Sequence, residues 1–319
     1  MVAKRVFITR SILSDGAQFL KENGLIVEVN AHDAPLSKDE LNRKAKEADA
    51  LITMLSDQID EAFLTENAHL KIIANYAVGF NNIDVACAKK LGIAVTNTPD
   101  VLTEATAETA LGLMLAAARR FQEASLSVHS GEWKSWHPQK HLGPALKGKT
   151  LGVIGLGRIG KRLAEMAHYA FHMRILYTAH SQKSTSYPAE WTDLNRLLKE
   201  SDFISLHVPL TEETRNLIGA REFPLMKPEA VLVNTARGEV IDQDALIEAL
   251  KSNRIFGAGL DVMTPEPLPL SSELLKCPNV FLLPHIGSAT FEARREMAML
   301  CAKNVVAGLK GEKLYSSVY

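Results

Sequence analysis

Three ionisable side chains of different kinds stand at the ends of mostly apolar runs in the second half of the chain. They are Arg237, Glu266 and His285, which follow the runs 231–236, 259–265 and 280–284. A guanidinium can hold a carboxylate and polarise a carbonyl, and an imidazole can donate a proton near neutral pH. A carboxylate beside that imidazole favours its protonated form. The set therefore suits hydride transfer to a 2-oxo acid, with Arg237 as the cation, His285 as the proton donor and Glu266 as its partner.

The sequence G-L-G-R-I-G at 155–160 directly follows the apolar run 151–154 and opens a helical segment. This order of strand, loop and helix is the context that a dinucleotide-binding loop requires. Gly155 would make the tight turn, Gly157 would let the backbone approach the pyrophosphate, and Gly160 would let the helix pack closely on the strand. Because the helix N-terminus would face the phosphates, the motif predicts a bound nicotinamide dinucleotide.

The next expected strand, 174–177, lacks at its end the carboxylate that accepts the ribose 2′-hydroxyl of NAD. Ala179 stands at that place, and no carboxylate follows before Glu190. The residues after it are mostly hydrogen-bond donors: His180, Ser181, Gln182 and Lys183. A 2′-phosphate needs such donors and would be repelled by a carboxylate, so we expect NADP(H) to be preferred, with NAD(H) as the possible second cofactor.

Length and composition fit a two-domain enzyme whose fold needs no metal and no disulfide. The 319 residues are 46% hydrophobic, which is enough for two cores. The formal net charge is −1 with Lys and Arg dispersed, so the sequence gives no sign of a nucleic-acid partner. The widely spaced cysteines, Cys87, Cys277 and Cys301, suit a reducing cytosol, where we expect them to be small buried hydrophobes rather than metal ligands.

No segment of the sequence is typical of membrane insertion or export. The N-terminal apolar stretch 6–8 is interrupted by Thr9 and Arg10, and the apolar run 110–118 is too short to span a bilayer. We therefore expect a cytoplasmic protein with no membrane partner.

Strands and helices alternate in two series, which favours parallel sheets covered by helices. The first series has apolar runs at 5–9, 25–29, 50–53, 70–74 and 93–96. The second has apolar centres at intervals of roughly 25 residues, the length of a strand plus a crossover helix, near Val153, Ile175, Ile204, Val231, Ala258 and Phe281. A long helix is expected over 104–120, and a closing helix over 291–309 that could pack back on the first domain. The predicted domains are 1–100 with 287–319, and 101–286.

Five motifs then carry a family resemblance over the whole chain. They are the glycine loop, N-T-A-R-G at 234–238, G-L-D-V at 259–262, P-E-P at 265–267 and P-H-I-G-S-A at 284–289. In this order they resemble the D-isomer-specific 2-hydroxyacid dehydrogenases, and within that family the glyoxylate/hydroxypyruvate reductases. The resemblance implies an α/β protein with two Rossmann-like or flavodoxin-like domains, the second binding NAD(P), and an active site in the cleft between them.

The same resemblance assigns residues to roles. Arg237, Glu266 and His285 form the catalytic set. The substrate would contact Leu55, the backbone amides of Val78 and Gly79, and the side chains of Arg237 and His285. The cofactor would contact Thr106, Gly155, Gly157, Arg158, Ile159, Gly160, Ala179, His180, Ser181, Lys183, Pro209, Thr235, Ala236, Asp261 and Gly287, with Asp261 at the carboxamide. No metal is implied.

The resemblance also implies a homodimer built through the nucleotide domain. In the reductase subgroup a tryptophan such as Trp133 or Trp136 reaches the partner's active site, although ordinary packing would explain these tryptophans as well. Two alternatives stay open: another 2-oxo acid such as 2-ketogluconate or phosphohydroxypyruvate as substrate, or a dinucleotide-sensing, corepressor-like binding protein. The physiological substrate and the direction of flux do not follow from the sequence.

Overall fold

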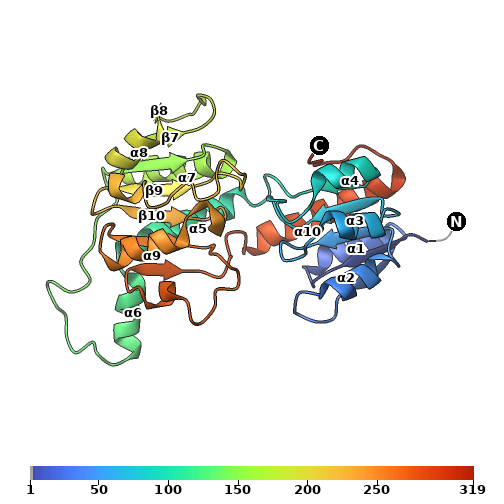
Figure 1. The fold of residues 1–319 in the computed structure, drawn as a ribbon, viewed down its shortest axis with the longest axis horizontal. Helices are drawn as coiled ribbons and strands as arrows, with labels where there is room; N and C mark the ends of the chain where they lie inside the picture. Colours follow the sequence, from blue (N-terminus) through green and yellow to red (C-terminus); the bar gives the residue numbers. More distant parts are fainter. Residues whose placement is uncertain (1–2) are drawn as a thin grey trace. The chain divides into compact units, whose positions relative to one another are not determined.

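The structure, a computed structural model, describes residues 3–319, which fold into two compact units (Figure 1). Unit 1 contains the residues up to Leu102 together with Ser288–Tyr319, and unit 2 is Thr103–Gly287. Unit 1 is discontinuous in sequence because the C-terminal helix, α10 (Phe291–Lys310), packs on its sheet and on its first helix.

Unit 1 is built on a five-stranded parallel sheet with the strand order β2-β1-β3-β4-β5. The strands are β1 (Arg5–Ile8), β2 (Ile26–Val29), β3 (Ala50–Thr53), β4 (Ile72–Asn75) and β5 (Ala94–Thr96). The helices between them are α1 (Ser14–Glu22), α2 (Lys38–Ala45), α3 (Glu61–Glu66) and α4 (Val85–Leu91). Helices α2, α3 and α4 share a core with Phe7, Leu51 and Ile73 of the sheet. Helix α10 packs on α1 and β4.

Unit 2 is built on a seven-stranded parallel sheet with the order β12-β11-β10-β9-β6-β7-β8. Its strands are β6 (Thr150–Ile154), β7 (Arg174–Thr178), β8 (Ala189–Trp191), β9 (Phe203–Leu206), β10 (Val231–Asn234), β11 (Gly257–Leu260) and β12 (Val280–Leu282). Its helices are α5 (Thr103–Ala118), α6 (Phe121–His129), α7 (Arg158–Phe171), α8 (Leu194–Glu200) and α9 (Gln243–Lys251), with 3-10 turns at Phe223–Leu225, Gly238–Val240 and Glu273–Lys276. The predicted α/β class with parallel sheets is confirmed.

Both faces of this second sheet are covered, which is why its central strands read as nearly continuous apolar runs. Leu151 and Val153 of β6 face the core formed with α5 and α7, whereas Ile154 belongs to the core formed with α8 and α9. These helices flank the sheet in Figure 1. Sequence patterning did not predict β8, a three-residue edge strand, or helix α6.

Strand order fixes where the functional residues of unit 2 gather. Strand β6, the first of the unit, has β9 on one side and β7 on the other. The chain first adds strands on the β7 side and then returns to add strands on the β9 side, so the strand order reverses beside β6. In open parallel sheets a ligand binds at such a reversal, beyond the carboxyl ends of the strands. The glycine loop leaves β6 at that point, and the turns carrying Arg237 and His285 follow β10 and β12 at the same edge.

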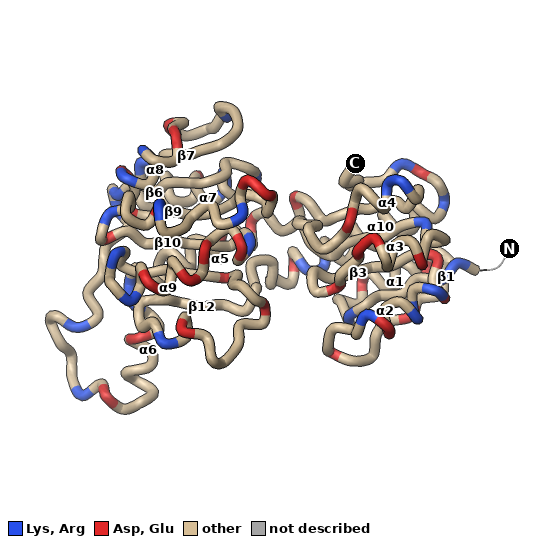
Figure 2. The backbone as a smooth tube through the Cα atoms, in the orientation of Figure 1, with Lys and Arg blue, Asp and Glu red and all other residues tan. Residues whose placement is uncertain are grey.

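Three features bear on broader properties of the chain. Lys and Arg are interspersed with Asp and Glu over both units (Figure 2). The three cysteines are buried and form no disulfide, as predicted. Among residues 3–319, no helix has the length and apolar character needed to cross a membrane.

Candidate active site

The glycine loop after β6 has the geometry of a dinucleotide cradle. Gly155 has a φ of +95°, and a Cβ there would lie 2.7 Å from the carbonyl oxygen of His207. A Cβ on Gly160 would lie 2.4 Å from the carbonyl oxygen of Gly155, so only glycine lets α7 approach the strand. A Cβ on Gly157 would meet no protein atom within 4 Å. The open side of Gly157 is therefore the side that can accept a ligand, next to the first turn of α7 with Arg158 and Ile159.

The loop after β7 presents donors to solvent. His180, Ser181 and Lys183 are exposed, and the Lys183 ammonium donates to the Ser181 hydroxyl at 3.1 Å. The loop's main chain is fixed by the buried Tyr177 hydroxyl, which accepts from the Lys183 N–H at 2.8 Å. Among the described residues, the first carboxylate after β7 is Glu190, which lies on β8 in ion pairs with Arg174 and Arg196. The Glu190 carboxylate is therefore paired with two arginines.

The turn after β10 is held by a fully buried asparagine. The Asn234 amide donates to the Arg237 carbonyl at 2.8 Å, and its side-chain oxygen accepts from the Ala236 N–H at 2.9 Å. Thr235 sits between these contacts, and its buried hydroxyl has no hydrogen-bond partner within residues 3–319. A buried polar group without a partner is costly, so this hydroxyl is well suited to a bound ligand. With the open Gly157 it indicates that the residues present fit a nicotinamide dinucleotide.

Glu266 and His285 form the central pair of the site. One Glu266 oxygen lies 2.7 Å from His285 Nδ1, and the other accepts from the Met263 N–H at 3.0 Å. The segment that carries Glu266 is tied to α9, because the Gln243 side chain both donates to the Thr264 carbonyl and accepts the Thr264 N–H. The carboxylate thus fixes the imidazole through Nδ1, which leaves Nε2 as the ring nitrogen able to donate to a ligand.

The backbone at His285 is held in a conformation that non-glycine residues seldom adopt. Its φ is +56°, a left-handed conformation that costs on the order of 1 kcal/mol and persists only when neighbours enforce it. Asp261 supplies the neighbours: its two carboxylate oxygens accept the N–H groups of Ile286 and Gly287, each at 2.7 Å, and its carbonyl accepts the His285 N–H at 2.9 Å. Asp261, only 1% exposed, therefore sets the direction in which His285 points.

The pKa shifts of Arg237, Glu266 and Asp261 reflect both their burial and the charges of their neighbours. Burial lowers the pKa of Arg237, and the nearby Glu266 carboxylate opposes that shift. Burial also raises the pKa of Glu266, but the hydrogen bond and charge of His285, with smaller help from Met263 and Arg237, outweigh it, so the net pKa is lowered. Burial raises the pKa of Asp261 despite its two N–H donors. Glu266 is therefore ionised at neutral pH, opposite the imidazole.

The remaining predicted cofactor residues lie around the same edge of the sheet. Thr106 is buried in α5, beside Gly287, whose Cβ would meet Thr106 Cγ2 at 3.3 Å and Asp261 Oδ2 at 3.0 Å. Pro209 follows β9 and is exposed. Thr106, Gly287 and Asp261 therefore form one cluster, while Ala179 lies beyond β7, at the far side of the glycine loop.

The predicted substrate residues Leu55, Val78 and Gly79 belong to unit 1. They follow β3 and β4 and are partly exposed. Their neighbouring strands are paired, so the two loops start from the same edge of that sheet. Their contact with substrate stays a prediction.

Sequence reasoning did not predict how the site is held together: Asn234 was noted only as part of the N-T-A-R-G motif, and Gln243 was not noted. It also missed His207, whose Nε2 lies 2.8 Å from the Ser205 hydroxyl, at the end of β9 beside Gly155. Burial lowers the pKa of His207 to about 4, so the ring is neutral at physiological pH. Its place directly after an apolar strand was the one available signal.

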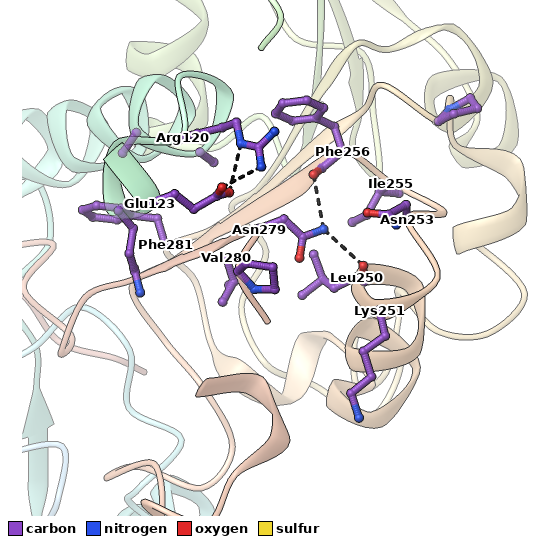
Figure 3. Close-up of a pocket in the computed structure, with 15 residues that line it drawn as sticks. Arg120, Glu123, Leu250, Lys251, Asn253, Ile255, Phe256, Asn279, Val280 and Phe281 are labelled. Atoms are coloured by element: carbon purple, nitrogen blue, oxygen red, sulfur yellow. Dashed lines mark hydrogen bonds and ion pairs between the residues drawn. The ribbon is translucent and has the colours of Figure 1, made fainter. Parts of the chain in front are cut away.

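Unit 2 also contains a cavity of about 390 Å³ that lies elsewhere (Figure 3). Its lining includes Ile255, Phe256 and Asn279, which precede strands β11 and β12, and the ion pair of Arg120 with Glu123 at the start of α6. The cavity is thus at the amino ends of the strands. None of the predicted site residues lines it, so it is not the candidate active site.

Comparisons with known proteins agree with the geometry. The family described as D-isomer specific 2-hydroxyacid dehydrogenase, NAD binding domain, matches residues 111–287. The glyoxylate reductase of Thermococcus litoralis is 51% identical over 317 residues, covering 97% of this chain and 94% of that protein. A solved structure from Thermus thermophilus has a TM-score of 0.93 at 44% identity, covering 99% of this chain and 100% of that one.

A further solved structure is that of an NADPH-dependent glyoxylate/hydroxypyruvate reductase from Sinorhizobium meliloti in complex with NADP and malonate. It has a TM-score of 0.83 at 30% identity and covers 99% of this chain and 96% of that one.

Proposed function

Because this chain belongs to the D-isomer-specific 2-hydroxyacid dehydrogenases, we propose that it reduces small 2-oxo acids with NADPH as the preferred cofactor. Glyoxylate would give the achiral glycolate, and hydroxypyruvate would give the D-2-hydroxy acid. The family predicted from the motifs is confirmed, and the chain is an oxidoreductase with a domain for a nicotinamide cofactor. The observation that carries the proposal is the Glu266–His285 pair, with His285 on a strained turn near the half-buried Arg237.

The bound cofactor would supply a hydride to the substrate carbonyl carbon. Arg237 holds the substrate carboxylate and polarises the carbonyl, since a guanidinium can donate to both groups at once. His285 donates the proton from Nε2 to the developing alkoxide. Glu266 stabilises the imidazolium before that transfer, and Asp261 keeps the ring in place.

The loop after β7 supports the preference for NADPH. Its exposed donors, His180, Ser181 and Lys183, suit a phosphate group, and Glu190 is engaged by two arginines rather than placed for a ribose hydroxyl. The relative from Sinorhizobium meliloti is named as NADPH-dependent. NADH is expected to be the poorer cofactor.

A steady-state assay tests the activity. Oxidation of NADPH is followed with glyoxylate, hydroxypyruvate, 2-ketogluconate and phosphohydroxypyruvate as separate substrates. We expect the highest kcat/KM with glyoxylate or hydroxypyruvate. A higher value with either of the other two acids would assign a different substrate, and tight dinucleotide binding without turnover of any of them would favour the corepressor-like alternative.

We also propose a homodimer formed through unit 2. The segment 121–142 exposes several large apolar side chains, namely Phe121, Leu126, Val128, Trp133, Trp136 and Leu142. Trp133 and Trp136 are 61% and 81% exposed, which is unusual for tryptophan unless a partner covers it. Sedimentation at micromolar concentration should give twice the 35.0 kDa of one chain. A 35.0 kDa species would contradict the dimer. A cytoplasmic location stays a prediction.

A further inference from the structure

We propose that Asn97, supported by Asn75, is a positioning residue that aims the backbone N–H groups of Val78 and Gly79 at the substrate carboxylate. The inference rests on the proposed function, since it assumes that these amides bind a 2-oxo acid. Neither asparagine is part of any sequence motif used above. Both act from the sheet of unit 1 on the loop that follows β4.

Three successive carbonyl groups of that loop are fastened by donors. The Ala77 oxygen accepts from the Thr98 N–H at 2.8 Å, and the Val78 oxygen accepts from Asn97 Nδ2 at 2.7 Å. The Gly79 oxygen accepts from Asn75 Nδ2 at 2.9 Å. Two adjacent peptide groups are therefore held by residues 97 and 98, and the third by the end of β4.

Fastened carbonyls determine where the N–H groups point. In a planar trans peptide the C=O and N–H bonds are directed oppositely, and the peptides here are trans. Because the Ala77 and Val78 carbonyls both point to the segment 97–98, the N–H groups of Val78 and Gly79 both point away from it. Across residues 3–319, neither of these N–H groups donates to a protein atom, and both residues are partly exposed. Two amides aimed to one side can bind the two oxygens of a carboxylate.

The two asparagines are themselves fixed. Asn75 is fully buried, and its side-chain oxygen accepts from the Thr53 hydroxyl at 3.1 Å. The Asn97 carbonyl accepts from the Ser316 hydroxyl at 2.6 Å, and that hydroxyl accepts from Asn304 of α10 at 2.8 Å. A continuous chain of hydrogen bonds thus runs from the C-terminal helix through Ser316 and Asn97 to the Val78 carbonyl. The loop is preorganised by groups that do not touch the substrate.

This arrangement predicts a particular kinetic signature. The substrate carboxylate keeps its charge while the carbonyl is reduced, so its binding is equally strong in the ground state and the transition state. Losing a contact of that kind raises KM and leaves kcat unchanged. Replacing a residue that acted only on the stability of unit 1 would not raise KM while leaving kcat unchanged.

The test compares Asn97→Ala and Asn97→Asp with a matched control, Asn67→Ala. Asn67 is fully buried in unit 1 and also donates its amide to a backbone carbonyl, that of Phe63 at 2.8 Å, but it closes helix α3 instead of the loop. For both Asn97 variants we expect the KM for glyoxylate to rise about 10-fold, as for the loss of one hydrogen bond. Their kcat and their KM for NADPH should stay within about 2-fold of wild type. Asn67→Ala should lower the melting temperature without changing either KM.

Two further measurements keep the inference open to refutation. The Kd of oxamate, an unreactive analogue of a 2-oxo acid, should rise with the KM when it is titrated into the enzyme–NADPH complex. If the Asn97 variants do not fold, Ser316→Ala removes the hydroxyl that anchors Asn97 and should raise the KM for glyoxylate by about 3-fold, a weakened rather than a lost hydrogen bond.

An unchanged KM in folded Asn97 variants, or an equal rise in Asn67→Ala, would overturn the assignment. If none of the Asn97 variants folds, an unchanged KM in Ser316→Ala would do the same. Failure of the wild-type enzyme to reduce any 2-oxo acid would instead overturn the proposed function, so the two failures are distinguishable.

Discussion

Two regions at the same edge of the unit 2 sheet are built in opposite ways. The turns that carry Arg237, Glu266 and His285 are each held by a side chain that binds the backbone: Asn234, Gln243 and Asp261. The loop 179–184 that follows β7 is mostly exposed, and its donors point to solvent. Proton transfer and carbonyl polarisation need fixed geometry, whereas recognition of a phosphate needs mainly positive charge and donors within reach. Substitutions in the braced turns should therefore change the rate, and substitutions in the loop should change the choice of cofactor.

The largest expected effect is on the proton donor. His285→Ala should lower kcat by about 10² to 10⁴, because the alkoxide would then take its proton from water. NADPH binding, measured by fluorescence titration, should stay nearly unchanged. His180→Ala is the matched control from the loop and should leave kcat with saturating NADPH intact.

Strain at residue 285 requires a second control. Asparagine adopts left-handed conformations more readily than most residues, so His285→Asn should keep the backbone conformation while it replaces the imidazole with an amide that cannot act as a general acid. It should lose as much rate as His285→Ala. A variant at this position that kept more than about a tenth of the wild-type kcat would be inconsistent with general-acid catalysis.

Arg237→Ala should have the next largest effect, because it removes the cation that we propose binds both the carboxylate and the carbonyl of the substrate. We expect kcat to fall by roughly 10² to 10³, together with a rise in the KM for the 2-oxo acid. Arg237→Lys should restore little, since an ammonium lacks the planar fork that holds carboxylate and carbonyl together. Full rescue by lysine would show that only the charge matters at this position.

The same contrast explains what the sequence could and could not predict. The glycine loop, the strands before Arg237 and His285, and the long helix α5 follow from local patterns, and they match the structure within a few residues. Most of the bracing contacts could not be predicted, because they join residues that are far apart in the sequence and that only the tertiary fold brings together. The contacts of Asn234 with Ala236 and Arg237 are the local exception. Asp261 and Ile286 are 25 positions apart, and Asn97 and Val78 are 19 apart.

Short elements were not predicted from the sequence for a related reason. Strand β8 has only three residues, Ala189–Trp191, and gains its definition from pairing with β7 rather than from its own pattern. The sequence predicted a helix ending near α5's end but did not predict the start of α6. Helix α6 begins after Arg120, which has a left-handed backbone conformation, and position 120 holds neither the glycine nor the asparagine that usually marks such a conformation.

A substitution in the loop should alter specificity with little cost in maximal rate. Ala179→Asp places a carboxylate where a 2′-phosphate would lie, so we expect kcat/KM for NADPH to fall and that for NADH to rise. A change of 10-fold or more in their ratio corresponds to about 1.4 kcal/mol. Lys183→Ala is the control and should weaken the binding of NADPH without weakening that of NADH. A wild-type enzyme that already uses NADH more efficiently would contradict this reading of the loop.

The smallest effect, and the most specific one, is expected from Glu266→Gln. Because the pKa of Glu266 is lowered, its side chain stays ionised from neutral pH to below the pH at which a glutamate usually takes up a proton. The contribution of the carboxylate to stability is lost only as the pH falls through that lowered pKa. Throughout the pH range of an assay the imidazole therefore has a negative neighbour at 2.7 Å. Glutamine keeps the shape and an acceptor oxygen but removes the charge, so the imidazolium is less favoured and the basic limb of the reduction profile should move to lower pH. At the optimum the rate should fall only about 3- to 10-fold, because the proton donor itself is intact. A profile that overlays that of wild type would show that Glu266 orients the ring without controlling its proton.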